Sequence, residues 1–501
     1  MPTTKLSAFS TILISMFLTV CAYAQTGDNV SKLKKADTLG FVARMQEFAK
    51  RSAQLSASDL AADKAALEQS KVLDELKKTM QVAKSYLRSG VDTVGARTQI
   101  AMIEQDYATA VDGVITHKGT AQTFRNVTAT SKILTELLNK AEYRKLRLDL
   151  HQKQLNTFRY QLDSILNAPA LFKFSTDSAI LIKYMQRLRV LAYEVHPIDS
   201  SLKLASNNVQ GLLNQVNLQV FKLQSTLDEI GIYQSDLAHN TLNREFANIW
   251  DPAENYRPFD QILNQARQKA KLTLFFYAEN NIGKLVILVI LAMSSFIYLR
   301  SLKQIYIEKG MLSDDMEGQL VLRYPLFSAL LIVINLFQFM FPSAPFILSV
   351  IFWIIACASL TILFYKFITR YWMNIWLIMV ALFLITAFDN LILQASRSER
   401  WFMLITSIIG TIFGTVVILK GRKEELREKL ILIAIGFMAV LEFASTVANI
   451  YGRYNLSKTL LISGFLNVVV AILFLWTVRL INEGLFLAFS VYTRQDKKLF
   501  Y

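Results

Sequence analysis

The chain has 501 residues, of which 53% are hydrophobic and 19% are charged, and its formal net charge is +15. With a mean hydropathy of +0.32, this balance excludes both an ordinary soluble globule and a protein embedded wholly in lipid. The positive charge forms no basic stripe with interleaved aromatic residues, so we expect no nucleic-acid partner. Much of it flanks apolar segments, where Lys and Arg set the topology of a membrane protein.

Residues 1–24 have the pattern of a secretory signal peptide. Lys5 supplies a positive start, Ile12 to Val20 an apolar core, and the sequence AYA a small-x-small cleavage site before Gln25. The apolar core is too short to cross a bilayer of about 30 Å comfortably, which disfavours a first transmembrane helix. We therefore predict cleavage at the end of this segment.

The two cysteines agree with that prediction. A lipoprotein would use Cys21, but Val20 precedes it where a small residue is expected. Removal of the signal peptide leaves Cys357 as the remaining cysteine, so the exported region must be stable without disulfides. Cys357 lies in an apolar run and is expected to be a small packing residue.

Residues 25–275 are dominated by helix formers, and strand-like alternation is hard to find. From Val209 to Ile230 apolar residues recur at alternating four- and three-residue steps, and a looser series runs from Leu134 to Leu166. Such spacing is typical of the seam of a left-handed coiled coil or a long helical bundle. We predict an all-α fold in which 25–275 is an elongated, coiled-coil-rich bundle of antiparallel helices in the periplasm.

Four short segments predict where these helices end. They are Ser89-Gly90, the sequence HKGT around Gly119, NAPA around Pro169, and HPIDSS at 196–201. In the last of these, a proline stop would be followed by capping residues for the next helix. The segment Asn248–Leu272, with two prolines and a basic end, is predicted to be the linker to the membrane.

Residues 276–479 are predicted to form a bundle of transmembrane helices. Seven apolar stretches in this region are long enough to cross a bilayer with modest tilt. They are Ile282–Leu299, Leu326–Phe341, Phe346–Tyr365, Trp372–Leu393, Trp401–Leu419, Leu430–Ile450 and Thr459–Val478. The second is short and bracketed by Pro325 and Pro342, so it could instead belong to a re-entrant hairpin.

The loops between these stretches predict the orientation. The loops after spans 1, 3 and 5 carry four, two and five Lys or Arg residues, against Arg397, Arg400, Arg453 and Lys458 on the other side. By the positive-inside rule we predict a multi-pass protein of a bacterial inner membrane, with a periplasmic N-terminal domain and a cytoplasmic C-terminus. Residues 480–501 would be a basic tail on the cytoplasmic side, either an amphipathic surface helix or the start of a connection to more membrane protein.

An ionisable residue inside a membrane helix is a candidate functional residue. Glu442 lies near the middle of the sixth stretch and could be a proton or cation site, or a charge sensed during gating. The alternative is a protonated side chain hydrogen-bonded to another helix, for example to Asn335, Gln338 or Asn467. That alternative is favoured somewhat, because one acid without an intramembrane basic partner does not make a pathway.

Two further features of the apolar stretches have structural explanations. Asp389 lies near the outer end of the fourth stretch, where an interfacial salt bridge with Arg397 or Arg400 would account for it. Gly410 and Gly414 form a small-xxx-small motif in the fifth stretch, which indicates close contact with another helix.

Nothing in the sequence predicts catalysis. There is no Gly-rich phosphate loop, nucleophile elbow, HExxH motif or aspartate cluster, and the four histidines are widely scattered. We expect a protein that is not an enzyme, with no catalytic residues, no cofactor and no metal.

The order of signal peptide, cysteine-free helical domain and many apolar spans resembles the N-terminal part of the large members of the small-conductance mechanosensitive channel family. The stretch Arg453–Leu485, RYNLSKTLLISGFLNVVVAILFLWTVRLINEGL, looks like their auxiliary membrane region. The resemblance implies a tension-sensing region around the pore of an ion channel for osmotic protection. It also implies a heptameric homo-oligomer, with the lipid bilayer and cell-envelope components as partners.

The chain departs from that family at the pore. No span is rich enough in Gly and Ala to be the pore helix, and nothing after Val478 could be a β domain, so no pore residue is transferred. We hypothesise that the chain is a fragment or truncated product of a longer channel. The alternatives are a seven-transmembrane sensor lacking its output domain, whose exported domain would typically be β-rich, and a polytopic transporter, which would require an internal repeat that we do not find.

Overall fold

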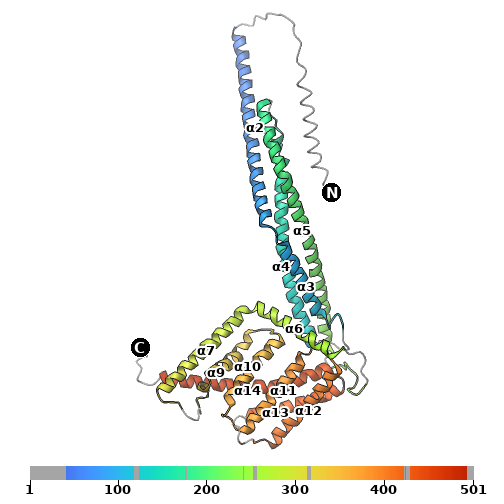
Figure 1. The fold of residues 1–501 in the computed structure, drawn as a ribbon, viewed down its shortest axis with the longest axis vertical. Helices are drawn as coiled ribbons and strands as arrows, with labels where there is room; N and C mark the ends of the chain where they lie inside the picture. The colour runs from blue at the N-terminus through green and yellow to red at the C-terminus, as the bar shows by residue number, and fades with distance from the viewer. Residues whose placement is uncertain are drawn as a thin grey trace. The chain divides into compact units, whose positions relative to one another are not determined.

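A computed structural model describes residues 41–117, 123–174, 178–240, 242–251, 257–312, 318–422, 424 and 429–492 (Figure 1). Over these residues the chain is almost wholly helical and has no strand, only an isolated bridge between Asp112 and Thr116. The prediction of an all-α fold is therefore confirmed for this part of the chain. The predicted signal peptide at 1–24 and the predicted helix break at Gly119 lie outside the described residues.

The chain divides into two compact units. The first contains Met1–Val82 and Gln161–Val195, and the second contains Ala83–Tyr160 and His196–Tyr501. Among the described residues, the N-terminal helices of the two units are α2 (Phe41–Ser89), α3 (Thr93–Val111), α4 (Phe124–Leu166), α5 (Ser178–His239) and α6 (Phe259–Asn280). Of these, α2, α4 and α5 have residues in both units.

In the second unit the predicted heptad seam is the buried side of α5. Val209, Val216, Leu223 and Ile230 are each no more than 1% exposed. They are seven residues apart, which is one four-residue and one three-residue step and returns a side chain to the same face of a helix. The C-terminal part of this seam, with Leu223 and Ile230, shares one hydrophobic core with residues of α3, α4 and α6.

Two of the predicted helix ends are observed and one is wrong. Helix α2 ends at Ser89, and Gly90 adopts a φ of +68° there; α4 ends at Leu166, before Pro169. Pro197, however, lies inside α5, which continues without a break. A proline removes one backbone donor, but burial of the apolar face on both sides of it holds the helix together. The segment predicted as a linker is likewise helical from Phe259 onward, because α6 buries one face in the bundle.

Six helices are long and apolar enough to cross a membrane, which indicates a multi-pass membrane protein. These apolar helices are α7 (Ile282–Glu308), α10 (Phe346–Phe364), α11 (Arg370–Leu391), α12 (Arg397–Lys420), α13 (Lys429–Ile450) and α14 (Tyr454–Tyr492). The prediction of seven spans is therefore too high by one in the described residues. The second predicted span is divided between α9 (Pro325–Phe337) and a 3₁₀ turn at Gln338–Met340, preceded by α8 (Leu320–Arg323). At 1.5 Å per residue, α9 is only about 20 Å long.

The last helix extends beyond the predicted span. Helix α14 continues to Tyr492, and Leu480 and Leu487 on it are at most 3% exposed. The hydroxyl of Tyr306 on α7 donates to the carbonyl of Leu487 at 3.0 Å. The part of the predicted tail that the structure describes is therefore a continuation of α14. One of its faces packs on α7 and α8, whereas Leu485, Phe486 and Phe489 are exposed.

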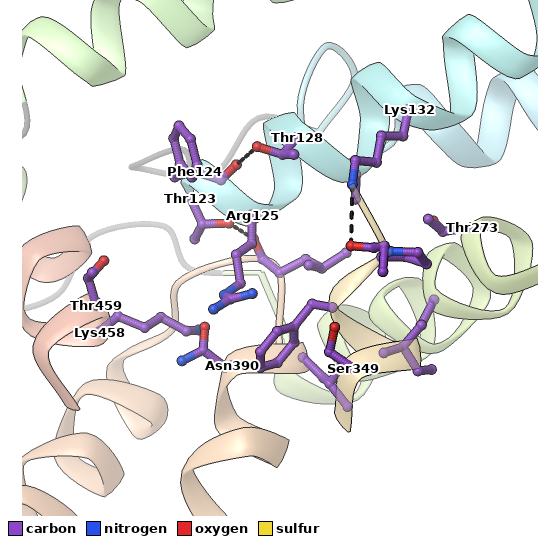
Figure 2. Close-up of a pocket in the computed structure, with 18 of the residues that line it drawn as sticks. Thr123, Phe124, Arg125, Thr128, Lys132, Thr273, Ser349, Asn390, Lys458 and Thr459 are labelled. Carbon is purple, nitrogen blue, oxygen red and sulfur yellow. Dashed lines mark hydrogen bonds between the residues drawn. The ribbon is translucent and has the colours of Figure 1, made fainter. Parts of the chain in front are cut away.

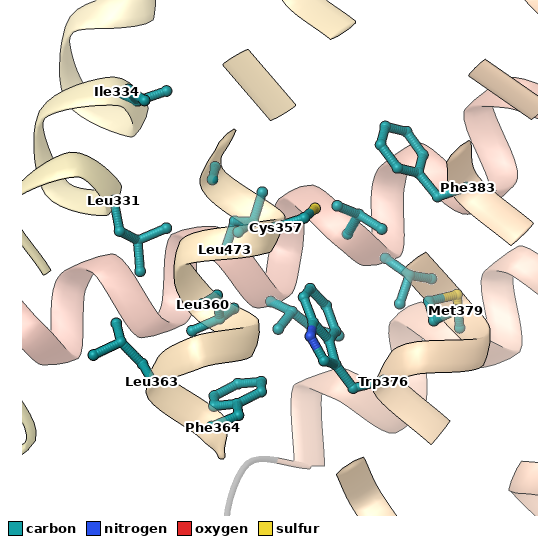
Figure 3. Packing of buried hydrophobic residues seen from close by; sticks show 14 of the residues in the cluster. Leu331, Ile334, Cys357, Leu360, Leu363, Phe364, Trp376, Met379, Phe383 and Leu473 are labelled. Carbon is teal, nitrogen blue, oxygen red and sulfur yellow. The ribbon is translucent and has the colours of Figure 1, made fainter. Parts of the chain in front are cut away.

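The apolar helices share one core, whose centre is shown in Figure 3. Phe364 of α10 makes edge-to-face contacts with Trp376 of α11 and Trp476 of α14, with ring centroids 5.6 and 4.7 Å apart. Cys357 is buried beside them, as expected for a packing residue. Helix α7 differs from the others, because only 6% of its most apolar 18-residue stretch is buried inside the protein. Its outer surface is therefore available to lipid.

Gly410 and Gly414 lie where α12 meets its neighbours. A Cβ atom added to Gly414 would lie 2.9 Å from Cβ of Ala439 on α13, and one added to Gly410 would lie 2.7 Å from the ring of Phe465 on α14. Both distances are shorter than van der Waals contact. The small residues thus set how closely α12 approaches α13 and α14.

We expect Gly414→Ala to destabilise the second unit by about 1–3 kcal/mol, because the packed core resists an added methyl group. The matched control is Gly283→Ala on α7, where nothing lies within 4 Å of the added Cβ. That substitution should be neutral or stabilising, since Ala favours a helix over Gly by about 1 kcal/mol. Thermal unfolding in detergent would measure both, and equal melting temperatures would contradict the packing role.

Candidate functional site

The loop Leu242–Asp251 lies against the turn between α13 and α14. The backbone N–H groups of Glu245 and Phe246 both donate to the carbonyl of Gly452, at 3.1 and 3.0 Å. Gly452 has a φ of +77°, and a Cβ added there would lie 2.0 Å from the carbonyl oxygen of Phe246. Only glycine satisfies both the backbone conformation and the close approach of the loop.

Side chains of the loop strengthen this contact. The carboxylate of Glu245 accepts hydrogen bonds from the backbone N–H of Asn455 at 2.8 Å and from its side-chain amide at 2.6 Å. It thereby caps the N-terminus of α14, where a negative charge is favourable. Burial raises the pKa of Glu245, and the hydrogen bonds from Asn455 oppose that rise. Phe246 packs edge-to-face on the ring of Tyr454, with centroids 5.7 Å apart.

Arg400 connects the same loop to α12 and α13. Both terminal guanidinium nitrogens donate to the carbonyl of Ala247 at 3.2 Å, and one also donates to the carbonyl of Asn449 at 3.0 Å. The Asn449 side-chain amide donates in return to the carbonyl of Arg400 at 2.8 Å. The guanidinium lies over the ring of Phe246, 5.1 Å from its centroid. Arg400, which the sequence suggested to be a loop charge, is thus a buried connector.

An ion pair lies beneath this contact. Lys458 on α14 pairs with the carboxylate of Glu399 on α12, and their side chains are 6% and 0% exposed. The hydroxyl of Tyr454 donates to the same carboxylate at 2.7 Å, and Lys458 also donates to the carbonyl of Ile392 at 2.9 Å. Glu399 and Ser396 form a capping box at the start of α12. A buried ion pair is tolerated only when such additional hydrogen bonds surround it.

Asp389 does not form the predicted salt bridge. Its side chain is fully buried, and neither carboxylate oxygen has a hydrogen-bond partner among the described residues. Arg397 is exposed and Arg400 is bound elsewhere, so the expected partners are not available. The prediction was wrong because the helix end is covered by protein, and the charges nearest to Asp389 are those of Lys458 and Glu399.

Helix α4 begins on the apolar helices. The hydroxyl of Thr123 donates to the carbonyl of Leu393 at 2.5 Å and accepts from the backbone N–H of Asn126 at 3.1 Å, which makes it the N-cap of α4. Farther along α4, the ammonium of Lys132 donates to the carbonyl of Ser343 at 2.6 Å. We call these contacts, together with those of the 242–251 loop, Arg400 and the Glu399–Lys458 pair, the polar junction.

Lys269 on α6 is a buried cation next to the polar junction. It is 0% exposed, and its ammonium donates to the Asn126 side-chain oxygen at 2.7 Å and to the Thr130 hydroxyl at 3.0 Å. Both partners are neutral. Burial lowers the pKa of Lys269 to about 7; the charge of Asp112 opposes that shift and Arg257 adds to it.

Glu442 is a different kind of buried group. It is 0% exposed on α13, and neither carboxylate oxygen has a hydrogen-bond partner among the described residues. None of the three suggested partners reaches it. Asn335 donates to Thr477 at 2.7 Å, Gln338 donates to Asn335, and Asn467 is exposed. Instead, glycines surround it, since a Cβ at Gly464 would lie 2.3 Å from its carboxylate.

The arrangement holds helices together through buried hydrogen bonds and an ion pair. The described residues include no cluster of three or more His, Cys, Asp or Glu side chains that could hold a metal ion. Sequence reasoning found Glu442, Asp389 and Arg400 but missed the Glu399–Lys458 pair. The sequence Ser396-x-x-Glu399 is a capping-box signature, and this signature could have pointed to Glu399.

No family model matches the chain, and no curated protein or solved structure is significantly similar to it.

We expect Gly452→Ala to displace the 242–251 loop, because the added methyl group collides with a backbone carbonyl that has no room to move. Gly90→Ala is the matched control, since Gly90 has a similar φ of +68° but nothing within 4 Å of its Cβ position. Both variants pay about 1–2 kcal/mol for the left-handed conformation. Gly452→Ala alone should lose a further 1–3 kcal/mol, roughly, from unpaired buried groups. Thermal unfolding and the rate of tryptic cleavage at Arg244 measure the difference, and identical behaviour would refute the docking role.

We expect Lys269 to make the stability of the second unit rise with pH above about 7. Its folded pKa of about 7 lies below the unfolded value of 10.5, so the unfolded state binds more protons between these values. Each pH unit in this window is worth up to about 1.4 kcal/mol in the free energy of unfolding, and thermal unfolding at a series of pH values would measure it. Lys269→Met should abolish this slope, whereas Lys271→Met, at an exposed position of α6, should retain it. A pH-independent wild type would rule the effect out.

Proposed function

We propose that the chain senses bilayer tension and transmits it between its N-terminal helices and its apolar helices, as the auxiliary region of a mechanosensitive ion channel for osmotic protection. The observation that carries this proposal is the polar junction. Through it the 242–251 loop and α4 are tied to the ends of α11, α12, α13 and α14 by buried hydrogen bonds. Movement on either side of such a connection is communicated to the other.

The exposure of α7 supports the tension-sensing part. Bilayer tension favours whichever conformation occupies more membrane area. In the described residues α7 packs chiefly on α9, and large side chains along it are exposed, among them Val286, Val289, Ile290, Met293 and Ile297. A helix that is held at its two ends by α6, α8 and α14 and exposes most of its length to lipid is suited to change the cross-section of the bundle. Helices α12, α13 and α14 pack closely together at Gly410 and Gly414. This group is therefore suited to stay in place while α7 moves.

The location and partners that we propose follow from the orientation predicted by the loop charges. We place it in a bacterial inner membrane, with the N-terminal helices in the periplasm and the C-terminus in the cytoplasm. The lipid bilayer would then be its main partner, and cell-envelope components would contact the N-terminal helices. A homo-oligomer, heptameric as in the family it resembles, would surround the pore of the channel.

A signalling receptor is the second candidate, because the polar junction would equally transmit a ligand-induced movement. Two observations make it the weaker one. The structure has six long apolar helices in the described residues where a seven-transmembrane sensor needs seven. The described part of the region that we predict to be exported is helical, whereas the exported domains of those sensors are typically β-rich.

Tension sensing is tested with the purified protein in liposomes. Fluorophores are attached to cysteines that replace Lys309, next to the end of α7, and Lys420, at the end of α12, in a Cys357→Ser background. Both positions are exposed. Hypo-osmotic swelling of the liposomes should increase the separation of the two fluorophores. A second pair at Lys420 and Lys429, on the tightly packed α12 and α13, is the control and should not change. If the first pair is equally unaffected up to the tension that ruptures the liposomes, the proposal fails.

A further inference from the structure

A pocket of about 420 Å³ lies beside the polar junction (Figure 2). It is bounded by the N-terminal ends of α4, α10 and α14, by the C-terminal end of α11, and by one side of α6. Three of its lining residues are cationic, namely Arg125, Lys132 and Lys458, and none of the described lining residues is acidic. The pocket is therefore a positively charged space in the second unit.

Arg125 has no counter-charge among the residues that the structure describes. Among the described residues its guanidinium donates no hydrogen bond and forms no ion pair; it lies over the ring of Phe346, 3.6 Å from the centroid. Burial lowers the pKa of Arg125 to about 10, which reflects the cost of a positive charge without an anion beside it. Figure 2 shows Arg125 and Lys458 extending into the pocket towards Asn390.

The two other cations are partly or wholly satisfied. Lys458 is neutralised by Glu399, and Lys132 donates to the carbonyls of Ser343 and Ala344, at 2.6 and 3.5 Å. These carbonyls are neutral, so the positive charge of Lys132 remains, and burial lowers its pKa. The pocket thus contains two uncompensated positive charges, those of Arg125 and Lys132.

Asn390 provides an independent sign of a missing ligand. It is 1% exposed at the end of α11, and its side-chain amide nitrogen is buried without a hydrogen-bond partner among the described residues. A buried donor left unpaired costs about 1–3 kcal/mol. An acceptor inside the pocket would satisfy both this amide and the guanidinium of Arg125.

The helix ends around the pocket favour an anion. Helices α4, α10 and α14 begin at Phe124, Phe346 and Tyr454, so the positive ends of their dipoles lie at the pocket. Some first-turn N–H groups of α4 and α14 are already bonded to Thr123, Asn455 and Glu245. Helix α11 presents its negative end, but the carbonyl of Ile392 just beyond it already accepts a hydrogen bond from Lys458. The combined field therefore attracts negative charge.

We propose that this pocket binds a phosphate group, held by Arg125 and Asn390, from the headgroup of an anionic phospholipid or from free inorganic phosphate. The fork of an arginine side chain matches two oxygens of a phosphate. A water molecule takes up about 30 Å³ in the liquid, so the pocket has room for a phosphate with an attached group. Apolar lining residues at the ends of α10 and α11, such as Ile347 and Leu391, suit the first carbons of a lipid. This inference does not depend on tension sensing.

The test uses the full chain in detergent and two probes, short-chain phosphatidylglycerol and inorganic phosphate. Binding of each is measured for the wild type, for Arg125→Gln and for Arg453→Gln. Arg453 is the matched control, because it is exposed just before α14 and does not line the pocket. Arg125→Gln should weaken binding at least tenfold, and Arg453→Gln less than twofold. Melting temperatures verify that both variants fold, as expected for Arg125, whose guanidinium makes no hydrogen bond with the described residues.

A second variant, Asn390→Leu, tests the same site without changing its charge. It should weaken binding of the same probe while leaving the dependence of binding on salt unchanged, because the number of ionic contacts is the same. Arg125-dependent binding of the lipid supports the headgroup as the source, and Arg125-dependent binding of phosphate alone supports the free anion. Binding of neither probe, or binding that Arg125→Gln and Arg453→Gln weaken equally, would overturn the proposal.

Discussion

The hydrogen bonds that the carbonyl of Gly452 accepts from Glu245 and Phe246 are the contact on which the polar junction depends. With the loop in this position, Arg400 reaches the carbonyl of Ala247, and the carboxylate of Glu245 reaches the start of α14. Each of these bonds lies in protein-covered surroundings, where an unpaired group is costly and neighbouring bonds strengthen one another. The loop is therefore held by a cooperative set of bonds, whose geometry requires a glycine in the turn.

The second unit treats its buried charges in two ways. Glu399 and Lys458 are paired with each other and with Tyr454, so their burial is compensated. Asp389 and Glu442 are buried without a hydrogen-bond partner among the described residues, and their cost is met by the packing of the helices around them. Buried polar groups that are paired stabilise one conformation. Buried groups without a partner destabilise the fold, so their presence indicates a function. The same reasoning marks Asn390 and Arg125 in the pocket as groups prepared for a ligand.

Local patterns in the sequence predicted the helical class, the long apolar helices and the heptad seam of α5, because the periodicity of apolar residues is visible within one segment. Contacts between distant segments decided the rest. Pro197 stays inside α5 because Val195 and Leu202, on either side of it, are buried, and α6 is helical because the bundle accepts one of its faces. Glu442 and Asp389 were recognisable as acids in apolar stretches. The partners Tyr454 and Lys458 were not, since they lie 55 and 59 residues from Glu399 and meet it only in the fold.

The polar junction contains part of the positive charge counted in the argument for topology. Of the four basic residues assigned to the outer loops, Arg400 and Lys458 are buried and bound within the protein, and only Arg397 and Arg453 are exposed. The positive-inside rule counts loop residues as the chain inserts, so the burial of Arg400 and Lys458 in the folded protein leaves the predicted orientation as it was. Arg125 and Lys132 differ from these loop residues, because they are cations that line a pocket. Among the described residues neither cation forms an ion pair with a carboxylate, and an anion from outside the chain would compensate their charge.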